Sequence, residues 1–253
     1  MARPKVNHPV PDLQLSPGVQ ALLISLGDIP ITTRERMILL AIEQIVERGP
    51  VDFNSGLVCD QLGIKHPMIK HYFGSKENLL SEALIWSFRD WHRVLTQCIS
   101  DPSKNPEELL KKRIRTEVEW GRSMKAMAIL SHYPMVSENA RRIISVTHTN
   151  EMQLLFEYHL AALTELIVAI RANLPFKFDF TVANFPRTET VLRHPHAFLA
   201  ATSISWATHG LVVWSSGDHL STRGFVNETV AGVSSKIAIE SHLNNIVKIA
   251  KGK

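Results

Sequence analysis

Basic side chains gather in one short stretch of this chain, residues 65–76. The stretch has three lysines and two histidines and no Asp or Glu: Lys65, His66, Lys70, His71 and Lys76. Phosphate is the natural counterpart of such a group of cations. The signal is local, because residues 1–80 hold eight Lys and Arg and eight Asp and Glu. From charge alone, a solvated helix whose lysines face water is an equal alternative.

The elements that must position these side chains have the pattern of a helix-turn-helix. Three apolar residues share one face of a helix predicted within residues 54–62: Leu57, Val58 and Leu62. Gly63 then permits a tight turn. A second helix is predicted over residues 66–73, with Pro67 near its start, where a missing N–H costs no helical hydrogen bond.

A long helix is predicted to follow. Gly74 ends the second helix, Ser75 is a suitable N-cap, and Glu77 lies in the first turn, where a carboxylate suits the helix dipole. Apolar positions continue until Asp101 and Pro102 stop the helix. One end lies beside the turn and the other enters the C-terminal part, so tilting this helix would move both.

The helix before the turn is predicted to begin at a capping box, Thr32 with Glu35, and to end at Gly49. Its buried stripe should pack against the two following helices to give a three-helix core. The stripe consists of Met37, Ile38, Ala41, Ile42 and Ile45.

From Thr32 to Leu80 the chain resembles the DNA-binding domain of the TetR (tetracycline-repressor) family of bacterial regulators. The resemblance rests on the opening TTRERMILLAIEQIVERG, the turn LGIKHPMIKHYFGSKENLL and their separation. The residues matching the family's pattern are Gly63, Ile64, Tyr72, Phe73, Gly74, Ser75, Lys76 and Leu79. Lys70 departs from it, because the family commonly has a phosphate-contacting Tyr there.

The resemblance implies an all-α fold with an N-terminal three-helix DNA-binding domain and a larger C-terminal helical domain for ligand binding and dimerisation. We expect a mobile extension over residues 1–31, with room for one short helix before Gly27, a DNA-binding domain over 32–80, and an effector-binding and dimerisation domain over 81–253. The expected DNA-binding residues are Lys65, His66, Pro67, Lys70, His71, Tyr72 and Lys76.

The strongest helices of the C-terminal part are predicted over residues 150–173, 197–214 and 225–250. The last two are rich in small residues, which allow close helix approach: Ala197, Ala200, Ala201, Ala207, Ala231, Gly232, Ser234, Ser235 and Ala238. In the resembled family the last two helices form a dimer interface, and a palindromic operator needs two heads. Packing within one chain is the alternative.

A ligand pocket has candidates on three helices: Trp120, Met124 and Met127, then Phe156 and His159, then Trp206 and His209. Within each set the spacing of three or four residues places the side chains on one face. Such stripes more often form hydrophobic core. The functional alternative is that these side chains line an apolar ligand cavity with one or two polar contacts. The loop over residues 173–195, with four phenylalanines, could cover a pocket mouth, reach a partner subunit or pack across helix ends.

Composition favours a soluble cytoplasmic protein, with 45% apolar and 21% charged residues and only two cysteines, Cys59 and Cys98. The charge-free run over residues 195–217 is long enough to cross a membrane, but its histidines, serines and threonines argue for a buried helix. We find no phosphate-binding loop, nucleophile elbow or His-Glu-x-x-His motif, and therefore predict no catalytic residues, no metal and no cofactor.

The sequence thus predicts a homodimeric DNA-binding transcriptional regulator that acts as a repressor and is released from a pseudo-palindromic duplex operator by a small apolar or amphipathic effector. The same fold controlled by a protein partner, or by no effector, is one alternative. An all-α metal-dependent or hydrolytic enzyme is the alternative from another functional class.

Overall fold

The structure is a computed structural model. It describes residues 13–27, 31–48, 52–101, 104–124, 142, 148–178, 193–215 and 235–252. Every regular element in these ranges is a helix, which confirms the predicted all-α fold.

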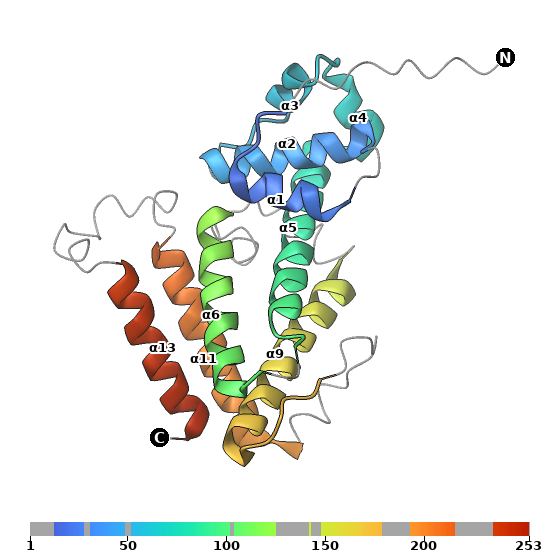
Figure 1. The fold of residues 1–253 in the computed structure, drawn as a ribbon. Coiled ribbons are helices and arrows are strands. Elements are labelled where there is room, and N and C mark those ends of the chain that lie inside the picture. The colour runs from blue at the N-terminus through green and yellow to red at the C-terminus, as the bar shows by residue number, and fades with distance from the viewer. Residues whose placement is uncertain are drawn as a thin grey trace.

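Four helices form a head at the N-terminal end of the molecule (Figure 1). They are α1 (Pro17–Ser25), α2 (Thr33–Arg48), α3 (Ser55–Gln61) and α4 (Pro67–Phe73). The long helix α5 (Lys76–Cys98) starts in the head and runs down into the rest of the molecule.

The helix starts of the head are fixed by the caps that the sequence predicts. The Thr32 N–H donates to Glu35 Oε2 at 2.6 Å and the Glu35 N–H donates to Thr32 Oγ1 at 3.3 Å, which is the reciprocal pattern of a capping box. Ser75 Oγ accepts from the Asn78 N–H at 3.1 Å at the start of α5. Each cap satisfies N–H groups that have no partner within their helix.

Helix α2 is buried on more sides than its predicted stripe, because α1 packs on it in addition to α3 and α5. Even the Glu43 side chain, 4% exposed, is enclosed there. Its carboxylate accepts from the Ser16 N–H at 2.8 Å and from the Ser16 hydroxyl at 2.9 Å. Burial nevertheless raises the pKa of Glu43, because it penalises the ionised form more than these hydrogen bonds favour it.

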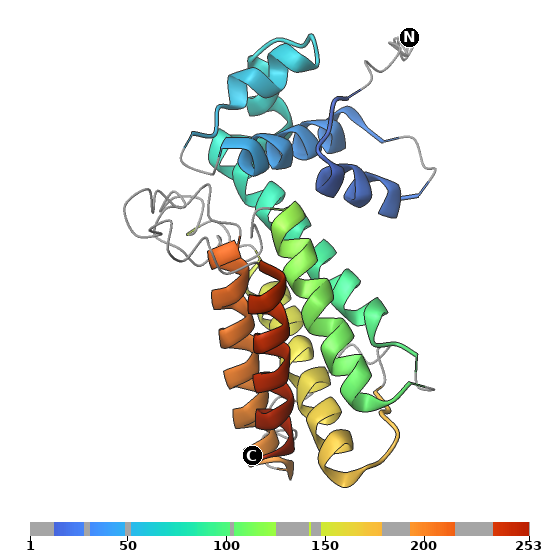
Figure 2. The same ribbon diagram turned by 60° about the vertical axis from the view of Figure 1, so that its left-hand side comes forward.

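Four further helices join the lower part of α5 to form the body: α6 (Pro106–Ser123), α9 (Thr149–Ala172), α11 (Pro195–Ser215) and α13 (Ser235–Lys251). Turned by 60°, they run side by side along the length of the body (Figure 2). Helix α9 lies between α5, α6 and α11, and α13 packs on α11, α6 and α9. The predicted helices over 150–173 and 197–214 are confirmed, as is the part of 225–250 that is described.

Among the described residues, the stretch Glu151–Ala172 of α9 has the length and apolar character needed to cross a membrane. In its apolar 18-residue window, 56% of the residues are buried inside the molecule. A core helix of a helical bundle has the same character, because it meets apolar neighbours on several sides.

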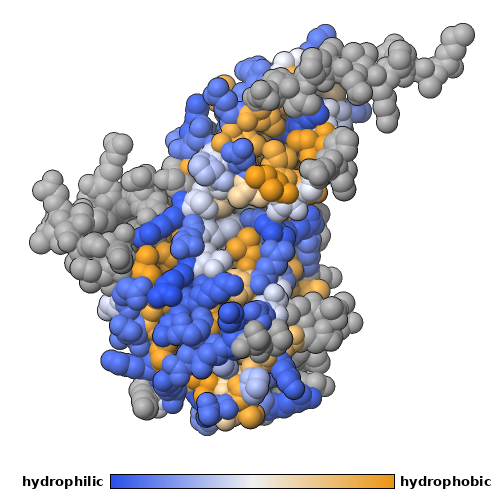
Figure 3. All heavy atoms as spheres, in the orientation of Figure 1, coloured by the Kyte–Doolittle hydropathy of each residue, from blue (hydrophilic) through white to orange (hydrophobic). Residues whose placement is uncertain are grey.

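Helix α1 connects the head to the body. Gly18 lies so close to the end of α6 that an added Cβ would be 2.6 Å from the Ser123 carbonyl oxygen and 2.9 Å from Met124 Sδ. Val19 and Leu22 of α1 belong to the same buried cluster as Met124. The opposite side of α1 leaves Ile24 71% exposed, and hydrophobic residues gather on the surface over this helix (Figure 3).

Some predicted features lie outside the described residues. They are Met127, Phe180, Phe185, residues 1–12, the helix breaks near 132–134, and the small residues Ala231, Gly232 and Ser234. Ala197, Ala200 and Ala201 are buried within the chain, where they pack α11 against its neighbours. Ala207 is exposed.

Candidate functional site

The turn between α3 and α4 holds the second helix of the helix-turn-helix at the surface of the head. Asn54 caps α3 through a 2.9 Å hydrogen bond from the Gly56 N–H. Gly63 has a φ of +63°, which an L side chain rarely adopts, and the Ile64 N–H then returns to the Cys59 carbonyl at 3.0 Å. The position of this turn can be predicted from the sequence, because the need for glycine at a positive φ depends only on the local backbone.

Helix α4 turns its apolar residues inward and its basic residues outward. Ile69 and Phe73 are 8% and 7% exposed. Most of the sequence-predicted DNA-binding residues are exposed: Lys65, His66, Pro67, Lys70, His71 and Lys76. Tyr72 is half-buried and its ring packs edge-on to the His71 ring at 4.9 Å, so Tyr72 also supports the helix.

Two of these basic residues have acidic neighbours at the surface. His66 Nε2 lies 3.0 Å from Asp60 Oδ1, which ties the start of α4 to α3. Lys76 Nζ lies 4.0 Å from Glu77 Oε1. Exposed pairs of this kind contribute little to stability and leave both side chains able to exchange partners.

A contact that the sequence does not reveal holds α4 in place from behind. The Arg34 guanidinium of α2 lies 5.0 Å from the centre of the Phe73 ring, and its Nη2 is 2.9 Å from Glu82 Oε1 on α5. Arg34, whose side chain is 39% exposed, therefore connects α2 and α4 of the head with α5.

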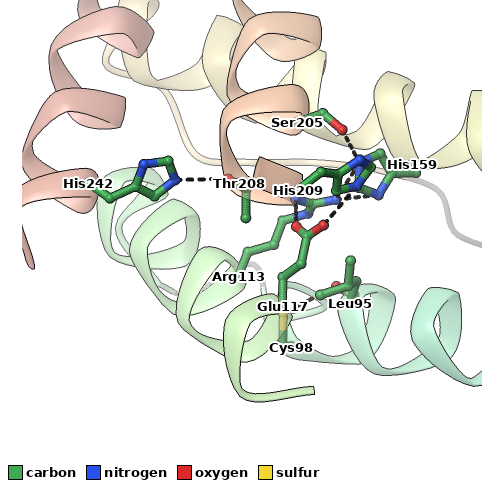
Figure 4. Close-up of polar contacts among 9 residues, drawn as sticks. All are labelled: Leu95, Cys98, Arg113, Glu117, His159, Ser205, Thr208, His209 and His242. Carbon is green, nitrogen blue, oxygen red and sulfur yellow. Dashed lines mark hydrogen bonds and ion pairs between the residues drawn. The ribbon is translucent and has the colours of Figure 1, made fainter. Parts of the chain in front are cut away.

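A second group of polar residues lies buried in the body, where α6, α9 and α11 meet (Figure 4). Arg113 and Glu117 of α6 are each 1% exposed, and His159 of α9 is 4% exposed. His209 of α11 completes the group, with Nε2 3.2 Å from Glu117 Oε1, an ion-pair distance outside hydrogen-bonding geometry. We call Arg113, Glu117, His159 and His209 the buried polar cluster.

Arg113 determines the protonation of His159. Its Nη2 lies 2.7 Å from His159 Nδ1, and a guanidinium can only donate, so Nδ1 accepts and carries no proton. The ring proton is then on Nε2, which lies 3.1 Å from Ser205 Oγ and donates to it. Burial, followed by the positive charge of Arg113, lowers the pKa of His159 well below its usual value, so the ring is neutral.

The cluster has the residue types of a metal site, since ligand atoms of Glu117, His159 and His209 all lie within 4.8 Å of one another. The Arg113 guanidinium, however, already lies against His159 Nδ1, the nitrogen whose lone pair is available. A divalent ion would add positive charge beside a buried guanidinium, where desolvated charges of the same sign are costly. The geometry therefore favours an anionic partner for the cluster over a cation.

A small cavity of about 10 Å³ adjoins the cluster between α5, α6 and α9. Its polar lining is His92, Thr96, Arg113, Tyr158 and His159. The His92 Nε2 atom is buried there, and no described residue forms a hydrogen bond with it. Burial and then the Arg113 charge lower the pKa of His92 to about 4.

Comparison with protein-family models gives no match, and no curated protein matches the chain. Among solved structures, the chain is similar to a TetR-like transcriptional regulator from Rhodococcus sp. RHA1, with a TM-score of 0.51 and 15% identity over 88% of this chain and 96% of that one. The chain has the TetR-like fold. It also aligns with a putative tetR family transcription regulator from Shewanella sp. PV-4, with a TM-score of 0.46 and 14% identity, over 86% of this chain and 97% of that one.

Within the TetR-like fold, the predicted ligand residues occupy three different places. Phe156, His159 and His209 come together around Trp91, whose ring stacks on His159 at 4.5 Å. Trp120 and Met124 are buried at the junction with the head, where Trp120 Nε1 donates to Asp90 at 2.8 Å. Trp206 is 67% exposed on α11, with its ring centre 6.1 Å from that of His209.

The sequence analysis did not select Arg113, Glu117 or His92. Arg113 and Glu117 are four residues apart on α6, but His159 and His209 are on other helices and distant in sequence. A buried arginine is a signal only when its burial is known, because most arginines are exposed.

Proposed function

We propose that this chain is a cytoplasmic DNA-binding transcriptional regulator that acts as a dimer, as a repressor released by a small effector. The observation that carries the proposal is the exposed side of α4. It presents Lys70 and His71 without an acidic residue on that helix, on a helix-turn-helix in a TetR-like fold. A helix of this kind fits the major groove, with lysines placed for phosphates and base edges.

Dimerisation through α11 and α13 is supported by apolar residues on their outer sides. Leu199 and Trp206 of α11 are 62% and 67% exposed, and Ile249 of α13 is 36% exposed. Large exposed apolar side chains on neighbouring helices are typical of an interface. A second copy bound there would supply the second head for a palindromic operator.

Helix α5 supports communication between the body and the head. Ser75 caps it beside α4, and Arg34 holds its Glu82 in the head. Farther along, His92 and Thr96 line the cavity in the body. A ligand that prefers one position of α5 would weaken DNA binding by the ratio of its affinities for the two positions.

The test is selection of a pseudo-palindromic duplex from random DNA, followed by binding of point variants. Lys70→Ala and Lys76→Ala should each weaken binding and lower the slope of log affinity against log salt by about one unit, because each removes one phosphate contact. Lys112→Ala is the matched control, since Lys112 is an exposed lysine of α6 in the body. No preference for any duplex over random DNA would refute the proposal.

A further inference from the structure

We propose that the cavity beside Arg113 binds the carboxylate of a small amphipathic acid, which pairs with the Arg113 guanidinium. This inference rests on the proposed function, because it names the chemical class of the effector that the body would recognise. It is carried by the partners of Arg113, by the lining of the cavity and by the position of both relative to α5.

Arg113 is a buried cation whose contact with a carboxylate is long. Its contact with a carboxylate, from Nη1 to Glu117 Oε2, measures 3.5 Å, whereas charge-assisted N–H···O bonds are commonly about 2.7 to 2.9 Å. Its shorter contact, at 2.7 Å, is to a neutral imidazole. A guanidinium can bind a carboxylate through two parallel N–H groups. An acid in the cavity would supply this two-point contact, which no described residue makes with Arg113.

The rest of the cavity wall suits the same guest. His92 brings a buried ring nitrogen that has no hydrogen-bond partner among the described residues. Thr96 adds a hydroxyl group, and aliphatic side chains complete the wall. These groups can hydrogen-bond a carboxylate and enclose an apolar chain, which is the usual composition of a small-molecule site.

The cavity of about 10 Å³ has room for roughly one water, so binding requires side chains to move. Tyr158 lines it, and Phe178 packs edge-on to the Tyr158 ring at 5.5 Å. Phe178 belongs to residues 174–178, which follow α9 without regular structure, and its side chain is half-buried. Displacement of this ring pair would open the space for the body of the acid.

Entry of the acid would also change the partner of Glu117. The incoming carboxylate competes with Glu117 for Arg113, and His209 Nε2 lies 3.2 Å from the other Glu117 oxygen (Figure 4). Glu117 would therefore shift toward His209, which connects α6 to α11. Because His92 and Thr96 belong to α5, the same event acts on the helix that reaches the DNA-binding head.

The experiment compares three acids with their primary amides, which have nearly the same shape without the charge: benzoate, phenylacetate and octanoate against benzamide, phenylacetamide and octanamide. With a Kd on the order of 1 mM, an acid at about 10 mM should raise the Tm of the full chain by about 3 to 6 °C. The amides should leave the Tm unchanged. Amides that stabilise as well as the acids, or no shift with any acid, would overturn the proposal.

Variants assign the effect to Arg113. Arg113→Gln with Glu117→Gln removes both buried charges together, so the folded chain is not left with one unpaired, and it should abolish the Tm shift. Arg115→Gln should keep it, because Arg115 is an exposed arginine of α6 paired with Glu240. A shift that persists in the double variant would refute the assignment.

Two further measurements separate this inference from its alternatives. Zinc added to chelator-treated protein should not raise the Tm; stabilisation by zinc that is lost in His159→Ala would replace the acid site with a metal site. Operator binding is measured independently of the acids. If the chain binds the acids but prefers no operator, the proposed regulator is refuted and the acid site is supported. If the chain binds an operator but none of the acids, the acid site is refuted and the regulator is supported.

Discussion

The contact between Gly121 of α6 and Val212 of α11 sets the distance between these helices. An added Cβ at Gly121 would overlap Val212 Cγ1 and lie 3.2 Å from Val212 Cβ and Cγ2. Val212 is 1% exposed and its helix is packed, so it cannot simply rotate away. Gly121→Ala should therefore destabilise the fold by about 1 to 3 kcal/mol, the usual cost of overpacking, even though alanine favours a helix over glycine by about 1 kcal/mol.

A double-mutant cycle tests this reasoning. Val212→Ala alone removes two buried methylene equivalents and should cost about 2 kcal/mol. In the double variant the two changes compensate, because the new methyl group occupies space that the valine has vacated. The double variant should then be at least as stable as Val212→Ala, which gives a coupling energy of about 1 to 3 kcal/mol opposite in sign to the single costs.

The assay is urea unfolding followed by circular dichroism, with unchanged slopes as evidence that the unfolding reaction is the same. Gly210→Ala on α11 is the control, because among the described residues its added Cβ would meet no atom within 4 Å apart from its chain neighbours and its own helix backbone. It should raise stability by up to about 1 kcal/mol. If Gly121→Ala behaves like this control, the close approach of α6 and α11 is wrong. Gly121 and Val212 lie one helical turn beyond Glu117 and His209, so Gly121→Ala should also weaken binding of the acid.

Two further predictions concern the dimer and the titration of the body. Trp206→Glu should convert the proposed dimer into a folded monomer with weaker operator binding, with the oligomeric state measured by light scattering after gel filtration. A dimer that is unchanged in this variant would contradict the proposed interface on α11. The His92 pKa is lowered to about 4, so the folded state binds fewer protons than the unfolded state, and the free energy of unfolding should fall as pH drops from 6.5 to about 4. His92→Gln should flatten that decline, measured by urea unfolding at each pH, and an unchanged pH profile would contradict the burial of His92.

The head could be predicted in detail from the sequence because its signals are local. Thr32 with Glu35, Gly63, Gly74 and Ser75 each require a specific backbone conformation or cap within a few residues. Such requirements hold in any surrounding structure, and the observed helices begin and end within a residue or two of the predicted positions.

Docking of α1 could not be predicted, because its apolar residues are compatible with several surfaces. The sequence indicates a short helix before Gly27, and the structure places Pro17–Ser25 against both α2 and α6. Glu43 shows the same limitation. Glutamates in helices are usually exposed, and the burial of Glu43 depends on the approach of Ser16, which is not encoded within its own helix.

The candidate ligand site was only partly predictable for a related reason. Spacing along one helix selects Phe156 with His159, and their rings do stack at 5.9 Å, with His159 buried and Phe156 half-buried. It cannot select Arg113 for its proximity to His159, since that contact depends on how α6 and α9 pack. The same kind of spacing also selects Trp206 as a ligand residue. Trp206 is exposed instead, because its side of α11 faces away from the chain's own core.

The close fit of Gly18 against the Ser123 carbonyl has a mechanical consequence for the head. A rigid domain attached at one point can rotate about any axis through that point. A second attachment restricts its rotation to the line through the two points. Helix α5 is the first attachment, and α1, held by Glu43 to the head and by Gly18 to the end of α6, is the second. The head is then restricted to turning about the line through both attachments, so a single angle would determine the distance between two heads in a dimer.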